Sequence, residues 1–442
     1  MTAPRQPTVR HLVLGAVAAV WLAVVVQGIT YRDALWFRYY VVNVAWLQDV
    51  FLALGTLSAV ILLVGRVRAR LPVAAWQSLP PVSIVIPAKN EVRVIEGVVR
   101  DACAQRYAGG IEVVVVDDRS TDGTGELLER LQAELPVTVV RTRPGSFGKA
   151  GALQVGVAAS RGSVLAVFDA DARMAPDVIA TMVPLLAAPR VAAVQGRRLV
   201  YNAGRNFLTR FQDDEYRVFQ TLMQGARQVL GGFVCLAGNG LLVKREALDA
   251  VGGWNPDALT EDIDLAVRLH LGGWEIRYCY DAQIWEEAVV TLRDLLRQRE
   301  RWFEGALQCL GEYLPRILRS RLPLVRKVDM LFFLSGSLIG ALAALTGYAY
   351  ALVGALLEAV VYIQLPGTLI AWASAALTVA MLAAVTTEVG YHPLRLVGVL
   401  GRWTLFSLHT LVIVPLAIWR YVHGALTGAR DWRKTSHEGG VG

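Results

Sequence analysis

The chain has 442 residues, of which 55% are hydrophobic and 18% charged, and its formal net charge is +7. This composition is more apolar than that of an ordinary soluble protein and indicates a membrane protein. The chain is long enough for two or three domains. The positive charge does not indicate nucleic-acid binding, because no DNA or RNA motif accompanies it. The basic residues are concentrated beside apolar runs, where they suit anionic lipid head groups.

Residues 1–70 are expected to form two transmembrane helices. The apolar runs 12–29 and 41–64 approach or exceed the about 20 helical residues needed to cross a bilayer core of about 30 Å. The first run could instead be a signal peptide, but it is long for one and no small-residue cleavage site follows, so we interpret it as an anchor. Arginines precede the first run and follow the second, which places the next domain in the cytoplasm.

Residues 71–292 have the pattern of an α/β domain, in which short apolar runs alternate with polar helical stretches. Such an order predicts an open, mostly parallel sheet, which binds ligands beyond the carboxyl ends of its strands. The expected strands are 82–86, 111–116, 136–141 and 163–167, and the expected helices are 91–105, 123–135 and one that opens at Gly148.

Acidic residues follow two of these strands. Asp117 and Asp118 come after the second strand, and Asp169 and Asp171 come after the fourth, two residues apart. Carboxylates at strand ends can be solvated turn residues, but they are also ligands for a divalent cation. The sequence therefore predicts that both acidic pairs meet at one edge of the sheet.

Two further motifs lie closer to the C-terminus. Thr260-Glu261-Asp262 precedes a helical pattern over 263–271, where a carboxylate can cap the helix or serve as a general base. Gln298, Arg301 and Trp302 stand in a basic segment, 293–326, that we expect to form helices on the membrane surface. Arginine suits phosphate, and an aromatic face suits a sugar ring, although both residues can also be interfacial anchors.

Apolar segments return at 328–355, 366–384 and 396–419, so residues 327–442 are expected to hold C-terminal transmembrane helices and a basic tail. An odd number of spans would place the tail outside, whereas its basic residues favour the cytoplasm. Either the first segment holds a tight hairpin or one segment is re-entrant. The sequence leaves this choice open.

Taken together, the motifs resemble the membrane-bound family-2 glycosyltransferases, which include cellulose, hyaluronan and poly-N-acetylglucosamine synthases and bacterial diacylglycerol glucosyltransferases. The resemblance implies a GT-A fold between transmembrane helices and a UDP-sugar donor. It implies that Asp171, with Asp169, binds Mg²⁺ or Mn²⁺, and that Lys149 contacts phosphate. Either Asp117 or Asp118 would hold the uridine, and the choice stays open because Arg119 replaces the family's usual glycine.

The same resemblance assigns the later motifs. Asp262 is expected to be the general base of an inverting single displacement, with Glu261 as the substitute candidate. Gln298 and Arg301 would contact the nucleotide diphosphate, and Trp302 would stack on the acceptor.

The expected function is transfer of a hexose, glucose by resemblance, to a membrane lipid such as diacylglycerol. The segments 238–240, 286–291 and 432–437 are similar to those of diacylglycerol glucosyltransferases. The alternative is a processive polysaccharide synthase that extends and translocates a glycan. In either case we expect a multi-pass protein of the inner or plasma membrane, and a non-catalytic transporter or scaffold would leave the acidic motifs unexplained.

Overall fold

The computed structural model describes residues 76–143, 148–217 and 223–335, together with residues 398, 402, 413 and 416. The predicted transmembrane runs 12–29 and 41–64, and nearly all of the apolar sequence after residue 335, lie outside the described residues. Within the described residues, no helix has both the length and the apolar composition needed to cross a membrane. Residues 76–335 all fall in one compact unit, Arg70–Ser335 with Val412–Gly442.

The first half of the sheet is parallel, as predicted. Its strands are β1 (Val82–Ala88), β2 (Ile111–Asp117), β3 (Val137–Arg141) and β4 (Val164–Val167), in the order β3-β2-β1-β4. They are rich in β-branched residues that fit a sheet buried on both faces. β1 continues through Pro87, which pairs with Val116, so this strand is longer than the predicted 82–86.

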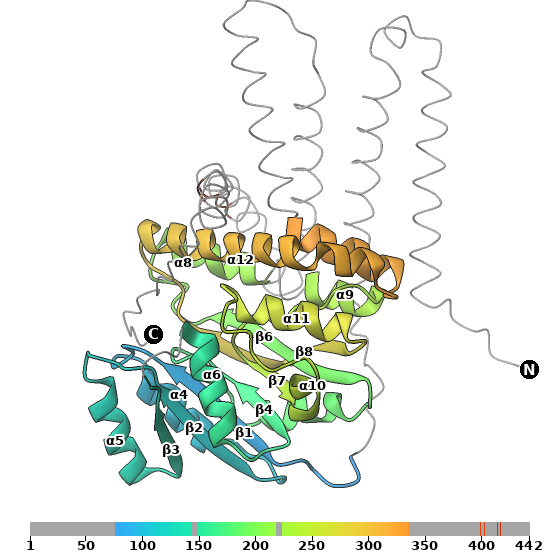
Figure 1. Ribbon diagram of the computed structural model, residues 1–442. Coiled ribbons are helices and arrows are strands. Elements are labelled where there is room, and N and C mark those ends of the chain that lie inside the picture. Colours follow the sequence, from blue (N-terminus) through green and yellow to red (C-terminus); the bar gives the residue numbers. More distant parts are fainter. Residues whose placement is uncertain are drawn as a thin grey trace, which may run out of the picture. The chain divides into compact units, whose positions relative to one another are not determined.

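Helices cover both faces of this half (Figure 1). α4 (Ile95–Cys103) and α5 (Thr124–Glu134) share a core with Ile84, whereas α6 (Gly148–Ala159) shares a second core with Val85. Neighbouring residues of β1 therefore face opposite layers, as strand geometry requires. α4 begins four residues later than predicted, because Glu91 accepts the backbone bonds of a turn that precedes the helix.

The second half of the sheet is mixed. β7 (Leu241–Lys244) lies antiparallel to β4 and to β6 (Val191–Val200), β8 (Glu275–Glu286) lies parallel to β6, and β5 (Arg173–Met174) is antiparallel to β8. The complete order is β3-β2-β1-β4-β7-β6-β8-β5. The prediction of an α/β domain with a mostly parallel sheet is confirmed, whereas the antiparallel strand in its middle was not predicted.

The remaining elements flank this half. They are α7 (Val178–Met182), η1 (Val183–Leu186), α8 (Phe207–Tyr216), α9 (Gly225–Leu230), α10 (Arg245–Ala250) and α11 (Glu261–Leu271). Of the segment 293–326, where helices were expected, most forms α12 (Leu292–Arg319), a helix of 28 residues that contains Pro315 and packs against α11 (Figure 1). A further helix runs over 324–335.

Candidate active site

The carboxyl ends of β2, β1 and β4 lie at one edge of the sheet. β1 pairs in parallel with both β2 and β4, so Asp117, the last residue of β2, and Asp169, which comes shortly after β4, lie on either side of the end of β1. The backbone N–H of Asp118 donates to Ala88 of β1 at 2.7 Å. The predicted meeting of the two acidic pairs at one edge therefore follows from the topology.

The turn after β2 holds both of its aspartates firmly. Asp117 accepts from the backbone N–H of Ser120 at 3.0 Å, and Asp118 accepts from the Thr142 hydroxyl at 2.7 Å. Asp118 also pairs with Lys89 at 3.3 Å. Arg119 adopts φ +58°, a left-handed conformation that glycine enters most easily.

Lys149, in the first turn of α6, joins three other parts of the chain. Its Nζ lies 2.5 Å from Asp169 Oδ1 and 3.1 Å from Glu261 Oε1, and it donates to the Gly238 carbonyl at 3.0 Å. The ammonium is therefore shared between two carboxylates and a backbone carbonyl. Burial acts to lower the pKa of Lys149, but the charges of Asp169 and Glu261 outweigh it and hold the pKa above its ordinary value.

Asp262 borders the same cluster. A Cβ at Gly238 would lie 3.1 Å from Asp262 Oδ2 and 3.2 Å from Lys149 Nζ, and Gly238 has φ +72°. The left-handed backbone favours glycine there, and a larger residue would also crowd both side chains. Burial, together with the neighbouring charge of Glu261, raises the pKa of Asp262 to about 7, which suits a general base near neutral pH.

Asp171 is buried and accepts the backbone N–H of Glu287, just after β8, at 2.9 Å. Within the described residues, no group of three or more His, Cys, Asp or Glu side chains is arranged to hold a metal ion. Mg²⁺ commonly takes only one or two carboxylates and completes its shell with water and substrate phosphates. Asp169 and Asp171 supply a donor set of that kind, so the residues present fit such a cation.

The residues of α12 form a separate group. The Arg299 guanidinium stacks 4.2 Å from the centre of the Trp302 ring and pairs with Glu215 at 2.5 Å. Trp302 also packs on a small apolar cluster that includes Tyr216. Arg299 was not predicted, because its place inside the motif gave no sign that it would support Trp302.

Gln298 and Arg301 lie on the same helix as Trp302. Among the described residues, Gln298 Oε1 is buried without a hydrogen-bond partner, and the side chain of Arg301 makes neither a hydrogen bond nor an ion pair. In this part of the chain, no direct polar contact joins either residue to the Lys149 cluster. The structure thus unites Lys149, Asp169, Glu261 and Asp262 and leaves the α12 residues apart from them.

A segment held by amide side chains connects β8 to α12. The amide of Asn202 pairs with both backbone polar groups of Ala288, and that of Gln212 pairs with both of Val289. Asn206 donates to the carbonyl of Val290 at 2.8 Å. These side chains supply the hydrogen bonds that a neighbouring strand would give to the backbone of residues 288–290. They therefore fix the path of the chain from Glu286 to the start of α12.

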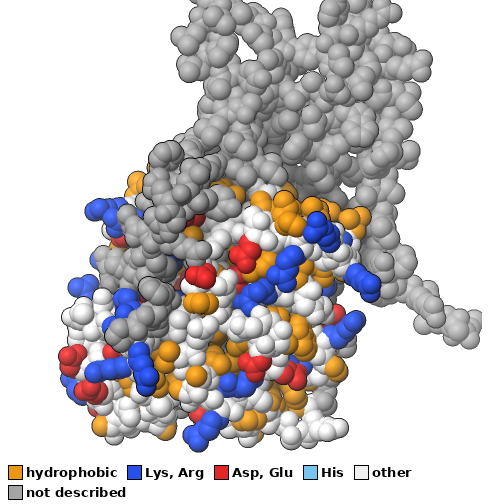
Figure 2. All heavy atoms as spheres, viewed as in Figure 1, with side chains coloured by type: hydrophobic (Ala, Val, Ile, Leu, Met, Phe, Trp, Pro, Cys, Tyr) orange, Lys and Arg blue, Asp and Glu red, His pale blue; other side chains and the backbone are white. Residues whose placement is uncertain are grey.

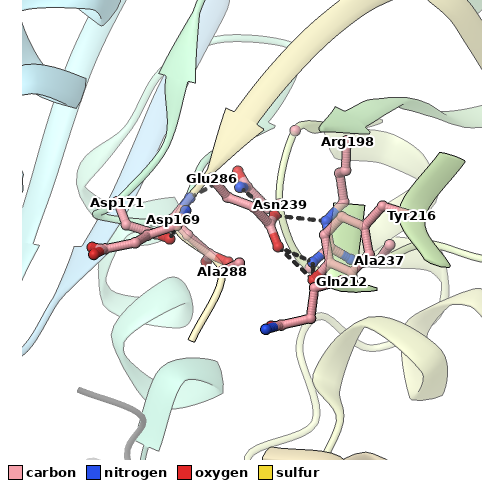
Figure 3. A network of polar contacts seen from close by, with 12 residues as sticks. Asp169, Asp171, Arg198, Gln212, Tyr216, Ala237, Asn239, Glu286 and Ala288 are labelled. Carbon is pink, nitrogen blue, oxygen red and sulfur yellow. Dashed lines mark hydrogen bonds and ion pairs between the residues drawn. The ribbon is translucent and has the colours of Figure 1, made fainter. Parts of the chain in front are cut away.

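Sequence analysis also missed a buried network behind Asp169 (Figure 3). Glu286, the last residue of β8, forms a bidentate ion pair with Arg198 of β6 and accepts from the Tyr216 hydroxyl and the Asn239 amide. Burial acts to raise the pKa of Glu286, but Arg198 outweighs it, so the pKa is lowered. The available signal was an acidic residue at a buried position at the end of a strand whose other charged residues are less buried.

An apolar and basic surface lies at the other end of α12. Leu314 and Leu318 are exposed, as are Leu324 and Val325 of the next helix, and basic residues lie among them: Arg316, Arg319, Arg321, Arg326 and Lys327. Figure 2 shows hydrophobic side chains together with Lys and Arg along this edge of the domain. The surface has the composition of a membrane-contacting helix.

The sheet order and the acidic residues at its edge define an α/β domain of the GT-A type, the fold of many sugar-nucleotide transferases. Residues 80–305 match the family model described as "Glycosyltransferase like family 2", and the chain belongs to this family. The fold also matches a solved structure, the mannosyltransferase PcManGT from Pyrobaculum calidifontis in complex with GDP-Man and Mn²⁺. That match has a TM-score of 0.55 and 22% identity, and covers 85% of this chain and 98% of the other.

Among curated relatives, the chain is 41% identical over 260 residues to beta-monoglucosyldiacylglycerol synthase from Nostoc sp. (strain PCC 7120). This alignment covers 58% of this chain and 55% of that protein. It is also 29% identical over 344 residues to glucomannan 4-beta-mannosyltransferase 7 from Arabidopsis thaliana. That alignment covers 75% of this chain and 60% of the other protein. The chain thus spans little more than half the length of these relatives.

Proposed function

We propose that this family-2 glycosyltransferase moves a hexose, glucose in the first instance, from a UDP-sugar to a membrane lipid such as diacylglycerol. The observation that carries the acceptor assignment is the 41% identity to a protein named for monoglucosyldiacylglycerol synthesis. Its aligned stretch is 260 residues long. The chemistry is supported by the charged cluster around Lys149.

The donor would bind at the carboxyl edge of the sheet. Asp117 or Asp118 would hold the uridine, and Lys149 would contact the diphosphate together with Gln298 and Arg301. Lys149 is already paired with Asp169 and Glu261, so the diphosphate would compete with these carboxylates for its charge. Arg301 has no described ion pair to give up, which leaves its guanidinium available for charge-assisted bonds.

Asp169 and Asp171 would hold Mg²⁺ or Mn²⁺, which supplies positive charge to the diphosphate leaving group. Asp262 would accept the proton of the acceptor hydroxyl as the oxygen attacks the anomeric carbon and the bond to UDP breaks. A single displacement of this kind inverts the anomeric configuration and requires one base. Glu286 is not a second nucleophile in this scheme, because four hydrogen bonds occupy its carboxylate.

The acceptor would approach from α12, where the Arg299 guanidinium lies over the Trp302 ring. The exposed leucines and arginines at the far end of this helix support contact with anionic lipid, which would bring the site to diacylglycerol. We place the catalytic domain on the cytoplasmic side of an inner or plasma membrane, with transmembrane helices on both sides of it in the sequence.

A second candidate is a polysaccharide synthase that extends a glycan. It is favoured by the match to a glucomannan mannosyltransferase, which extends over 75% of the chain and reaches beyond the catalytic domain. The donor chemistry would be the same. The two candidates differ in the acceptor that Trp302 would meet.

Radiolabelled UDP-glucose, given to the full chain in lipid vesicles with and without diacylglycerol, tests the proposal. A chloroform-soluble product that requires diacylglycerol is expected. Insoluble, high-molecular-weight label formed without added lipid acceptor would favour the polysaccharide synthase. No transfer of label under either condition, from UDP-glucose or from other UDP- and GDP-hexoses, would refute both.

A further inference from the structure

We infer that Glu286, fixed by Arg198 and Tyr216, is a positioning residue that sets Asp169 and Asp171 in the geometry that receives a metal-bound diphosphate. This inference rests on the proposed function, because it assigns a role within that site. Glu286 itself does not touch the reactants. It acts through Asn239 on one side and through its own chain neighbour on the other.

The carboxylate of Glu286 is fully engaged by protein donors. Oε1 accepts from Arg198 Nη2 at 2.5 Å and from the Tyr216 hydroxyl at 2.7 Å. Oε2 accepts from Arg198 Nε at 2.7 Å and from Asn239 Nδ2 at 3.0 Å. A carboxylate has about four lone-pair sites, so this one has no capacity left for a metal or a proton transfer.

Asn239 links Glu286 to Asp169 through two hydrogen bonds. Its Nδ2 donates to Glu286, and its Oδ1 accepts the backbone N–H of Asp169 at 3.2 Å (Figure 3). The amide therefore has one orientation, with its donor toward Glu286 and its acceptor toward Asp169. An aspartate at 239 would have the same shape but no donor, and would place a second negative charge against Glu286.

The backbone links Glu286 to Asp171. Glu287 follows Glu286, and its backbone N–H donates to Asp171 Oδ2 at 2.9 Å. Each aspartate of the pair is thus held from the end of β8, one through a side chain and one through the backbone. If two carboxylates are to favour one arrangement of metal and phosphate, their positions must be fixed before the ligand binds.

The network is buried, which makes its bonds strong and its loss costly. Arg198 and Glu286 are each less than 10% exposed, and the Arg198 guanidinium also lies 4.9 Å from the centre of the Tyr216 ring. Buried charges of this kind are stabilised only while their partners remain in place. A change in any member should therefore reach Asp169 and Asp171.

The test compares UDP affinity of the full chain in Mn²⁺ and in EDTA, by calorimetry. The ratio of the two dissociation constants measures how well the aspartates receive the metal, separately from overall stability. Asn239→Asp should reduce this ratio about tenfold, the scale of one lost hydrogen bond to a charged group. Tyr216→Phe, which removes one of four bonds to Glu286, should reduce it roughly threefold.

Tyr313→Phe is the matched control. The Tyr313 hydroxyl also donates to a buried carboxylate at 2.7 Å, that of Asp264, and Tyr313 is as deeply buried as Tyr216. This variant should lower stability as Tyr216→Phe does and leave the Mn²⁺ ratio unchanged. If Asn239→Asp does not fold, the comparison of the two Tyr→Phe variants decides.

A folded Asn239→Asp protein with the wild-type ratio would overturn the inference, and so would equal loss in Tyr216→Phe and Tyr313→Phe. Either result leaves the proposed function intact, provided that the wild type binds UDP more tightly with Mn²⁺. A wild type with no Mn²⁺ effect on UDP would instead refute the proposed metal–nucleotide site, and the inference with it.

Discussion

Replacement of Asp262 by asparagine should stabilise the protein while it removes activity. Burial and the charge of Glu261 raise the pKa of Asp262 from an ordinary 3.8 to about 7. A group whose pKa is higher in the folded state costs stability as pH rises through the folded value. At pH 8 the Asp262 carboxylate is ionised in both the folded and the unfolded protein. The full free-energy penalty of holding its charge in the folded site is therefore subtracted from the stability.

The cost can be worked out from these values. Each tenfold difference in proton affinity equals about 1.4 kcal/mol, so the full difference is about 4 kcal/mol. Asp262 is partly exposed, and screening by solvent reduces the figure to roughly 2 kcal/mol. Asparagine keeps the carbonyl that accepts the N–H of Ile263 at 2.9 Å and removes the charge. Asp262→Asn should therefore raise the melting temperature at pH 8 by roughly 4 °C or more.

Thermal unfolding of the full chain between pH 5 and pH 8 measures this effect. The advantage of Asp262→Asn should shrink by more than half at pH 5, where the folded wild type holds a proton on Asp262. Glu261→Gln is the comparison: it removes a charge that helps raise the pKa of Asp262, but it also removes an ion pair with Lys149 at 3.1 Å, so it should stabilise less than Asp262→Asn. Transfer should fall by about 10²-fold in Asp262→Asn. A variant that is less stable at pH 8, or whose advantage does not depend on pH, would refute the reasoning.

Three further outcomes are expected. Asp171→Asn should abolish the tightening of UDP binding by Mg²⁺ or Mn²⁺, because a carboxamide lacks the charge that holds the cation; full wild-type turnover in EDTA would contradict this. Trp302→Ala should raise the acceptor KM without weakening UDP binding, and Arg301→Ala should do the reverse, so equal effects of both on both substrates would contradict the assigned roles. The transfer rate should rise with pH to a plateau above about pH 7 as Asp262 loses its proton, and a flat profile from pH 5 to pH 8 would assign the base elsewhere.

The sequence predicts the first half of the domain well, because its strands are short apolar runs separated by polar helices. The runs 111–116 and 163–167 are found within one residue of their predicted bounds, as β2 and β4. β6 is different, since all ten of its residues are buried. A strand buried on both faces shows no alternation, and the antiparallel β7 beside it is only four residues long, so periodicity could not reveal either.

The candidate site was predictable where a motif carries its own chemistry. Asp169, Glu261 and Asp262 were singled out in the sequence, and the structure brings them together around Lys149. The support behind them was not predictable. Arg198 and Asn239 lie far from Glu286 in the sequence, and only the packing of β6 against β8 and the turn at 238–240 places them in contact.

The amide-held segment between β8 and α12 has a consequence for how the chain tolerates change. Paired strands hold one another through backbone atoms, so most side chains can be exchanged without loss of the pairing. Residues 288–290 depend instead on the side chains of Asn202, Asn206 and Gln212. These three positions should therefore accept almost no other residue in a saturation mutagenesis screen, although none of them belongs to the candidate site.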